Sequence, residues 1–367
     1  MSTVTIELPS QPGYIHFHPE ERFSTPHRLW QGCPTIVCTA KGRLLAGWYS
    51  GGIAEPDMRN YNLLVRSDDH GETWSEPILV IESKLSIGLR CIDIQLWIDP
   101  AGKCWVFWTQ VIGWGGGPGC PGKEFHETWA MTADDPDAEE IRWSEPFYVT
   151  DGFLRCKPTT LRDGRWLMCA YDRNSEHYCY SESLDQGKSW IRRKAGRKIP
   201  TPFDESIILE HRDGTLRLFA RTAGTGHIAE SVSTDGGKTW SDGFNGPLTS
   251  PGSRFYIGRL RSGNLICVRN NDAVDRINLS VSISGDDGRT WSPPMLLDAR
   301  MHTSYPDVAE DSDGVIYILH DWSRFEEKAI LLTRLTEPEI MARGMLRDSS
   351  RVAQIINQPP RHPLYPR

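Results

Sequence analysis

The sequence predicts an all-β fold, namely a six-bladed β-propeller made of four-stranded antiparallel blades. Two observations lead to this prediction. An octapeptide of the form Ser-x-Asp-x-Gly-x-Thr/Ser-Trp occurs four times, as SDDHGETW (67–74), SLDQGKSW (183–190), STDGGKTW (233–240) and SGDDGRTW (284–291). A turn glycine followed by an apolar run also recurs, at intervals of 49 to 62 residues. Repeats of this length are typical of propellers and other repeat architectures.

Each repeat unit reads as strand A, glycine turn, strand B, loop, strand C, Asp turn and strand D. Alternating apolar residues and many β-branched or aromatic side chains indicate strands throughout. The turn glycines are Gly42, Gly102, Gly164, Gly214, Gly263 and Gly314. Six four-stranded units form a six-bladed propeller. We expect one domain over residues 1–367, with blades at roughly 25–85, 86–150, 151–200, 201–250, 251–300 and 301–357.

Two units depart from the pattern. The second has a degraded Asp turn at 132–146 and a long glycine-rich loop at 109–129, which is either a lid or simply a flexible loop. The last lacks the Asp turn, and its fourth strand is expected from TVTIEL (3–8) or RVAQIIN (351–357). Either segment would let the termini close the ring and would cover a strand edge. TEPEIMARG (336–344) predicts one short helix.

The octapeptide is interpreted as a folding element. Asp side chains stabilise tight turns, Gly adopts backbone angles that other residues avoid, and Trp is a large apolar plug between blades. Because it occurs in four blades, it is typical of a scaffold rather than of an active site. Antiparallel geometry places these C–D turns on one face, and the strand A starts and B–C loops on the other. We expect the functional site on that second face.

Charged and polar residues gather at this predicted site face. The strand A starts carry Gly32, Cys33, Asp93, Lys157, Asp204, Glu205, Arg254, Tyr305 and Asp307. The ends of strand B and the starts of strand C carry Tyr49, Asp57, Arg59, Asp172, Arg173, Arg221, Arg276, His320 and Arg324. Acids, arginines and a tyrosine that point to one axis predict a polar pocket.

Composition narrows the class of protein. The net charge is −7 and no Lys/Arg-rich run stands out, which argues against nucleic acid as a partner. No stretch approaches 18 apolar residues, so no membrane span is expected. The N-terminal segment lacks a secretory signal pattern, and nine cysteines without a Cys-x-x-Cys pair favour buried thiols in the cytoplasm. No His/Asp/Glu cluster has ligand spacing, so we expect no metal and no cofactor; the oligomeric state stays open.

With these repeats, the chain resembles the sialidase (neuraminidase) superfamily, whose repeats are called Asp boxes or BNR repeats. The resemblance covers roughly residues 25–335. It implies that Tyr305 in SYPDV is a nucleophile and that Glu205 in DESIILEH is its partner base. It also implies that Asp57 in AEPDMRNYNLLVR is the acid/base residue.

The resemblance further implies that Arg221 in LFARTAG and Arg276 in VDRINLSV bind a substrate carboxylate. The family's first arginine directly precedes Ile-Pro, whereas QGCPTI places Gly32 at that position. This departure weakens the case for a sialic acid carboxylate and leaves the case for a sugar-cleaving pocket intact. The further substrate-binding candidates are Arg28, Arg59, Arg254, Lys157, Asp93 and Asp307.

The sequence therefore predicts a glycoside hydrolase that retains anomeric configuration through a tyrosine nucleophile, the exception that sialidases form among glycosidases. A lyase acting on a uronate is a rival hypothesis, with a tyrosine or one of His27, His126 and His320 as base. A non-catalytic glycan-binding propeller is a second rival, and a purely structural module is a third. The sugar stays open between a uronic acid, a different nonulosonic acid and a neutral sugar.

Overall fold

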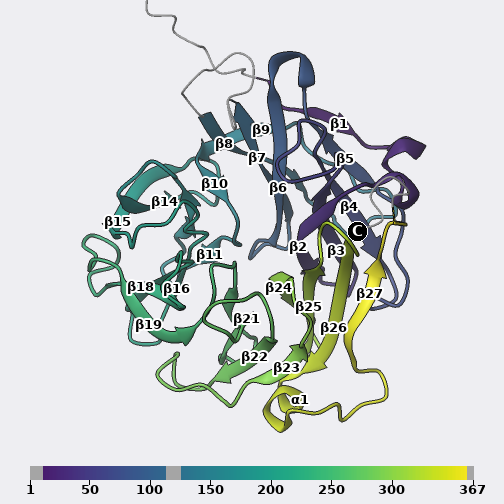
Figure 1. Ribbon diagram of the computed structural model, residues 1–367. Coiled ribbons are helices and arrows are strands. Elements are labelled where there is room, and N and C mark those ends of the chain that lie inside the picture. The colour runs from purple at the N-terminus through teal and green to yellow at the C-terminus, as the bar shows by residue number, and fades with distance from the viewer. Residues whose placement is uncertain (1–10, 113–124, 362–367) are drawn as a thin grey trace, which may run out of the picture.

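Six blades of antiparallel β-sheet are arranged around a central axis, as the sequence predicts (Figure 1). The computed structural model describes residues 11–112 and 125–361. The chain runs around the ring in sequence order, so the first and last blades become neighbours (Figure 1). The sheets are antiparallel, and strand A of each blade is an edge strand of its sheet.

The first three blades contain the strands up to Arg197. Blade 1 comprises β2 (Gln31–Cys38), β3 (Leu44–Ser50), β4 (Tyr61–Ser67) and β5 (Leu79–Glu82), and β1 (Tyr14–His16) pairs with β5. Blade 2 comprises β6 (Leu89–Ile98), β7 (Cys104–Ile112), β8 (Phe125–Ala133) and β9 (Phe147–Asp151). Blade 3 comprises β11 (Thr159–Thr160), β12 (Trp166–Met168), β14 (His177–Ser183) and β15 (Ile191–Arg197), and β10 (Phe153–Leu154) pairs with β13 (Ala170–Tyr171).

The last three blades follow the same order. Blade 4 comprises β16 (Ile207–Glu210), β17 (Leu216–Ala220), β18 (His227–Ser233) and β19 (Phe244–Thr249). Blade 5 comprises β20 (Tyr256–Arg259), β21 (Leu265–Asn270), β22 (Leu279–Ser284) and β23 (Met295–Asp298). Blade 6 comprises β24 (Thr303–Glu310), β25 (Val315–Trp322), β26 (Ala329–Thr336) and β27 (Arg351–Asn357). Short 3-10 turns lie at Glu21–Phe23, Thr25–His27 and Leu85–Ile87.

The fourth strand of blade 6 is β27, the RVAQIIN segment that the sequence offered as one of two candidates. The other candidate, 3–8, lies outside the described residues. The predicted short helix is α1 (Glu337–Ala342). It begins after Thr336, whose backbone N–H donates to Glu339 Oε2 at 2.8 Å, a side-chain cap on a free helical donor. Most of the glycine-rich loop of blade 2 also lies outside the described residues.

The core consists of apolar clusters that bridge neighbouring blades. One of them joins Leu44 and Trp48 of blade 1 to Tyr317 and Leu332 of blade 6, so the ends of the chain share a core. The tryptophan of each octapeptide packs against such a shared cluster; these residues are Trp74, Trp190, Trp240 and Trp291. The structure confirms the predicted role of these side chains between blades.

The four Asp-box turns (67–74, 183–190, 233–240 and 284–291) share one hydrogen-bond pattern. In the turn at 233–240, Ser233 Oγ donates to Asp235 Oδ1 (2.9 Å) and accepts the Gly237 N–H (2.9 Å). The Thr239 N–H and hydroxyl donate to the two oxygens of Asp235 at 2.9 and 2.6 Å. These bonds close the loop between strands C and D, and no atom of this turn lies at the strand A starts.

Two further findings concern the predictions from composition. Over the described ranges, no helix is long and apolar enough to cross a membrane. Eight cysteines lie in those ranges and all eight are free thiols; seven of them are buried.

Candidate active site

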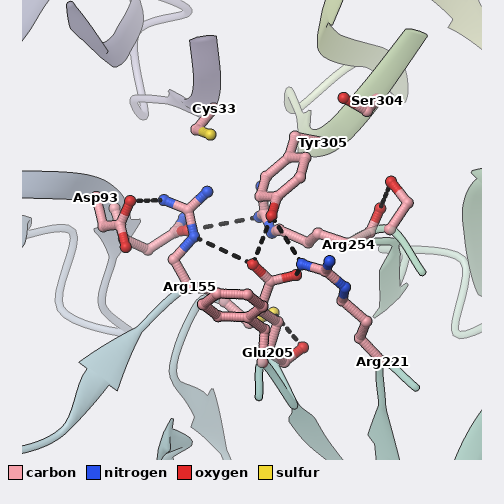
Figure 2. Close-up of polar contacts among 12 residues, drawn as sticks. Cys33, Asp93, Arg155, Glu205, Arg221, Arg254, Ser304 and Tyr305 are labelled. Atoms are coloured by element: carbon pink, nitrogen blue, oxygen red, sulfur yellow. Dashed lines mark hydrogen bonds and ion pairs between the residues drawn. The ribbon is translucent and has the colours of Figure 1, made fainter. Parts of the chain in front are cut away.

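Four blades have a non-glycine residue with positive φ in or just before strand A. Cys33, Asp93, Glu205 and Tyr305 have φ values of 60°, 60°, 32° and 53°. In blades 1, 2 and 6 the pairing register with strand B shifts at these residues, which marks β-bulges. Positive φ is uncommon outside glycine, and such residues concentrate at functional sites. Figure 2 shows that the side chains of Asp93, Glu205 and Tyr305 point toward one space, whereas Cys33 does not line it.

This space is a cavity of about 490 Å³, within the range of small-molecule sites. Strand A starts, strand B ends and B–C loops contribute to its lining, as the predicted face requires. The residues that line it are Glu55, Pro56, Asp93, Arg155, Tyr171, Phe203, Glu205, Arg221, Arg276, His302, Ser304, Tyr305, Ser323, Arg324, Phe325 and Glu326. The lining therefore combines four arginines, four carboxylates and an aromatic portion.

Tyr305 and Glu205 meet on the wall of this cavity. The Tyr305 hydroxyl donates to Glu205 Oε1 at 2.7 Å and accepts from Arg221 Nη1 at 3.0 Å. Arg221 Nη1 also lies 2.9 Å from Glu205 Oε2 (Figure 2). Both Tyr305 and Glu205 are buried. The phenol thus has a carboxylate that can accept its proton and a guanidinium that can stabilise the charge left behind.

The pKa shifts of the pair agree with these roles. Burial and the negative charge of Glu205 raise the pKa of Tyr305 above its ordinary value, against the opposing charge of Arg221. Burial by itself would raise the pKa of Glu205, but the charges of Arg221 and Arg155 and the Tyr305 hydrogen bond outweigh it and lower that pKa. At neutral pH the phenol is therefore protonated and the carboxylate ionised, which is the starting state for a tyrosine with its own base.

A second buried pair adjoins the first. Arg155 Nη1 donates to Asp93 Oδ1 at 2.6 Å, and Arg155 Nε lies 3.8 Å from Glu205 Oε1 (Figure 2). Burial raises the pKa of Asp93 to about 7, although the positive charge of Arg155 opposes this shift. Burial thus makes Asp93 harder to ionise than an exposed aspartate, a direction of shift that is common among functional carboxylates.

Guanidinium groups surround the Tyr305 ring. The Cζ atoms of Arg324, Arg155 and Arg276 lie 4.1, 4.9 and 5.5 Å from the ring centroid. With Arg221 at the hydroxyl, four cations face one phenol. Such a density of positive charge beside a cavity suits an anionic ligand, because arginine binds carboxylates through paired N–H groups.

Six residues of the predicted site face line the cavity: Tyr305, Glu205, Arg221, Arg276, Arg324 and Asp93. Asp57 does not. Its carboxylate is held by Arg59 through bonds of 3.0 and 2.8 Å and accepts the Ile53 N–H at 3.2 Å. The hydrogen bond from Arg59 is the largest cause that lowers the pKa of Asp57, to about 2. Arg59 itself is exposed and also lies outside the lining.

Lys157, Arg254 and Asp307 form a charged layer in the propeller core, outside the cavity lining. Lys157 Nζ lies 3.0 Å from Asp307 Oδ2 and donates to the carbonyl of Ile36 at 2.6 Å. Arg254 Nη2 lies 3.2 Å from Asp307 Oδ1. Burial lowers the pKa of Lys157 against the charge of Asp307. The three side chains thus bind one another and backbone carbonyls, and their contacts connect strand A of several blades.

The remaining candidates also lie elsewhere. Arg28 is buried beside the C-terminal strand, where Nη1 donates to Asn357 Oδ1 at 3.0 Å and Nε to the Phe23 carbonyl at 3.1 Å. The three histidines weighed for a lyase do not line the cavity; they are His27, His126 and His320. The described residues contain no group of three His, Cys, Asp or Glu that could hold a metal ion.

Two cavity residues carry no clear signal in the sequence. Arg155 lies two positions before Lys157, the residue that the sequence predicts at the start of strand A in blade 3. Arg155 directly follows the short strand β10, which pairs with β13 and lies before the apolar run that predicts strand A. In the segment FLRCK (153–157), Arg155 would be predicted as a site residue only if strand A were taken to start two residues earlier, at Arg155 in place of Lys157. Glu55 lies two positions before Asp57 on the same loop, and only the fold of that loop shows which carboxylate faces inward.

Comparisons with known proteins agree with this architecture. Residues 96–318 match the BNR repeat-like domain family, and residues 65–76 match the BNR/Asp-box repeat. The chain is 30% identical to the anhydrosialidase of Macrobdella decora over 188 residues, which are 44% of this chain and 24% of that protein. It is 26% identical to a sialidase of Bacteroides fragilis (strain YCH46) over 329 residues, or 79% and 59% of the two lengths. The chain thus spans less than two thirds of either relative.

Solved structures show the same fold at low identity. The intramolecular trans-sialidase of Ruminococcus gnavus, in complex with oseltamivir carboxylate, superimposes with a TM-score of 0.68 at 17% identity. That match covers 90% of this chain and 98% of the other. The leech intramolecular trans-sialidase gives a TM-score of 0.67 at 17% identity, covering 92% and 72%.

The fold and the cavity together define a BNR-repeat propeller whose Asp-box turns lie opposite an arginine-rich pocket. The chain belongs to the BNR repeat-like domain family and, with it, to the sialidase superfamily.

Proposed function

We propose that the protein is a sialidase-type glycoside hydrolase that cleaves a terminal acidic sugar with retention of anomeric configuration. The contact between the Tyr305 hydroxyl and Glu205 Oε1, at 2.7 Å on the cavity wall, supports this proposal most strongly. The sialidase and anhydrosialidase among the relatives favour the same class of reaction. The arginines of the lining favour a negatively charged sugar over a neutral one.

The proposed reaction has two displacements. Tyr305 Oη attacks the anomeric carbon while Glu205 accepts the phenolic proton, and the bond from that carbon to the leaving oxygen breaks. The leaving oxygen takes a proton from a carboxylic acid. Water, deprotonated by the resulting carboxylate, then attacks the anomeric carbon and the bond to Tyr305 breaks, with the proton of Glu205 returning to the phenol. Two inversions give net retention.

We assign the proton donation to Glu55 in place of Asp57. Glu55 lines the cavity, and its Oε2 lies 2.8 Å from Arg324 Nη1. A substrate carboxylate that took this N–H would release Glu55 from Arg324 and leave it free to contact the leaving oxygen. Asp57, in contrast, is tied to Arg59 outside the lining, and its pKa of about 2 opposes protonation at neutral pH.

The test is a product screen with the purified protein. Fluorogenic and natural sialosides, uronides and neutral glycosides are incubated with the protein, and products are identified by mass. We expect release of an acidic sugar. Its mass distinguishes attack by water from an intramolecular product, which the anhydrosialidase and the intramolecular trans-sialidase among the relatives make worth testing. An unsaturated uronate product, or binding without any product, would overturn the proposal.

A further inference from the structure

The backbone conformation at Gly32 does not require glycine. Unlike many glycines in this fold, it has no positive φ, so a side chain would cause no backbone strain. What the position lacks is space. A Cβ atom there would lie 2.7 Å from Cδ, 2.9 Å from Nε and 3.0 Å from Cγ of Arg324. The side chain of Arg324 thus lies directly over the Gly32 Cα and occupies the volume that a residue 32 side chain would fill.

Arg324 reaches this place from the opposite end of the sequence. It follows β25 of blade 6, whereas Gly32 belongs to β2 of blade 1. Arg324 Nε donates to Asp321 Oδ2 at 2.8 Å, and Nη2 lies 3.3 Å from Ser304 Oγ. Asp321 Oδ2 in turn accepts the Cys33 N–H at 2.7 Å. The guanidinium is therefore oriented by two buried partners of blade 6, one of which is itself bonded to blade 1, and it lines the cavity.

The outer N–H groups of Arg324 face the ligand space. Nη1 is paired with Glu55 Oε2 at 2.8 Å, and the Glu55 side chain is 25% exposed, so a ligand can compete for this contact. Arg221, Arg276 and Arg324 surround Tyr305 at its hydroxyl and its ring. An anionic group placed beside Tyr305 would thus meet guanidinium groups from blades 4, 5 and 6.

We propose that Arg324 determines specificity for an anionic substrate by binding its carboxylate, and that residue 32 is glycine to make room for this arginine. This inference rests on the proposed function and extends it. The third arginine of the pocket is thereby supplied from blade 6, in place of the arginine that Gly32 replaces in blade 1. The substrate carboxylate takes the N–H that Glu55 holds in the free protein, while Asp321 and Ser304 keep the guanidinium in place.

The first test measures charge discrimination by binding. A Tyr305→Phe background stops turnover, and calorimetry compares an N-acetylneuraminide and a glucuronide, each as free acid and as methyl ester. We expect Arg324→Met to reduce the preference for the acid about 10- to 100-fold, the range of charge-assisted hydrogen bonds. Arg324→Lys should restore part of it, because lysine keeps the charge and loses the planar fork. The matched control is Arg300→Met, since Arg300 is paired with Asp298 and lies outside the lining.

The second test exchanges the two residues. Gly32→Arg alone should abolish acid preference, because the new side chain and Arg324 need the same volume. The double variant Gly32→Arg/Arg324→Gly should recover at least part of it, with the arginine now supplied from blade 1. Removing Arg324 leaves Asp321 without its cation, so each variant is first checked for native thermal unfolding. The double variant keeps the test decisive if the single ones fold poorly.

The outcomes separate the two proposals. Unchanged acid preference in folded Arg324→Met, or a wild-type pocket that does not distinguish acid from ester in either pair, would overturn the role of Arg324. A double variant no better than Gly32→Arg would overturn the spatial equivalence of the two positions. Intact acid preference without any glycoside cleavage by the parent protein would instead overturn the proposed hydrolase and leave Arg324 as the anion-binding residue of a binding protein.

Discussion

The Asp-box turns on one face and the strand A starts on the other are both repeated positions, and they differ in what occupies them. At the turns, the same Ser, Asp, Gly and Thr/Ser contacts recur in four blades. At the strand A starts, a left-handed residue recurs, on a bulge in blades 1, 2 and 6, but its identity changes from Cys33 to Asp93, Glu205 and Tyr305. One face repeats residue and geometry together, whereas the other repeats geometry alone and changes the residue.

This difference shows how a symmetric scaffold forms an asymmetric site. A bulge in strand A directs a side chain toward a common space whatever that side chain is, because its direction follows from the backbone. Each blade can then contribute a different group to one cavity. The Tyr305–Glu205 pair joins blades 6 and 4, and the Arg155–Asp93 pair joins blades 3 and 2. Catalytic residues are therefore expected at repeated positions where the residue type changes from blade to blade.

The comparison is tested most severely by two tyrosines of blade 6. Tyr305→Phe should reduce glycoside turnover on the order of 10³-fold or more, because the proposed nucleophile is removed. Tyr317→Phe should leave turnover near that of the parent, since its hydroxyl bonds Asp311 Oδ2 at 3.0 Å beside the glycine turn of the same blade. Steady-state kinetics on the substrate found in the product screen measures both. Equal turnover losses in the two variants would refute the assignment of chemistry to the strand A starts.

The next largest effect concerns the loop between β3 and β4. Glu55→Gln should slow cleavage of a sugar leaving group about 10²-fold or more, and cleavage of an aryl leaving group far less, because only the former needs a proton. Asp57→Asn serves as the matched control two positions away and should show no such dependence on the leaving group, because Asp57 is paired with Arg59. If the dependence is found with Asp57→Asn instead, the Arg59 pair opens in the complex and Asp57 is the donor that the family resemblance implies.

The sequence predicts the Asp-box face of the molecule better than it predicts the face of the strand A starts. The Asp-box turns are readable because the hydrogen bonds that shape each loop lie within eight consecutive residues, as between Ser67, Asp69 and Thr73. The number of blades, the glycine turns and helix α1 follow from comparably local patterns. Strand order places Tyr305, Glu205, Arg221 and Arg276 among the polar residues of the site face, and the family motifs select these four, since neither spacing nor composition distinguishes them from the other polar residues there.

The rest of the site depends on tertiary structure. Whether Glu55 or Asp57 faces the cavity is decided by the path of one loop around Arg59. Lys157 and Asp307 stand two positions after Arg155 and Tyr305, so strand alternation predicts that each pair lies on the same side of its strand. In the structure, however, Lys157 and Asp307 bind each other outside the cavity lining. The relation between Gly32 and Arg324 spans most of the chain, and only the folded ring brings the two residues into contact.

Mutation of the charged layer of Lys157, Arg254 and Asp307 should lower stability strongly and change turnover little, unlike mutation at either face. Asp307→Asn removes the partner of two buried cations, so we expect it to lower the free energy of unfolding by about 3 to 5 kcal/mol. Turnover of the remaining folded protein should change little, because Asp307 does not line the cavity. Denaturant unfolding and kinetics at low temperature measure the two effects. A large loss of turnover with unchanged stability would place this layer within the active site.

The smallest effect is expected at the Asp-box turns, and it should be similar in each of them. Asp235→Asn should leave turnover unchanged and lower the unfolding temperature slightly, because the exposed carboxylate accepts only local bonds, from Ser233, Lys238 and Thr239. The hydroxyl of Thr239 is the main cause that lowers the pKa of Asp235 to about 2, below its ordinary value near 4.

Because the pKa of Asp235 is lower in the folded state, its stabilising contribution is complete above about pH 4 and is lost as the pH falls toward 2. The difference in unfolding temperature between the parent protein and Asp235→Asn should therefore shrink over that interval. Asp286 has a pKa lowered to about the same value by Thr290, so Asp286→Asn should give the same profile. Calorimetry at several pH values records both variants. Clearly unequal profiles would show that the Asp-box turns, despite their identical contacts, are not equivalent parts of the scaffold.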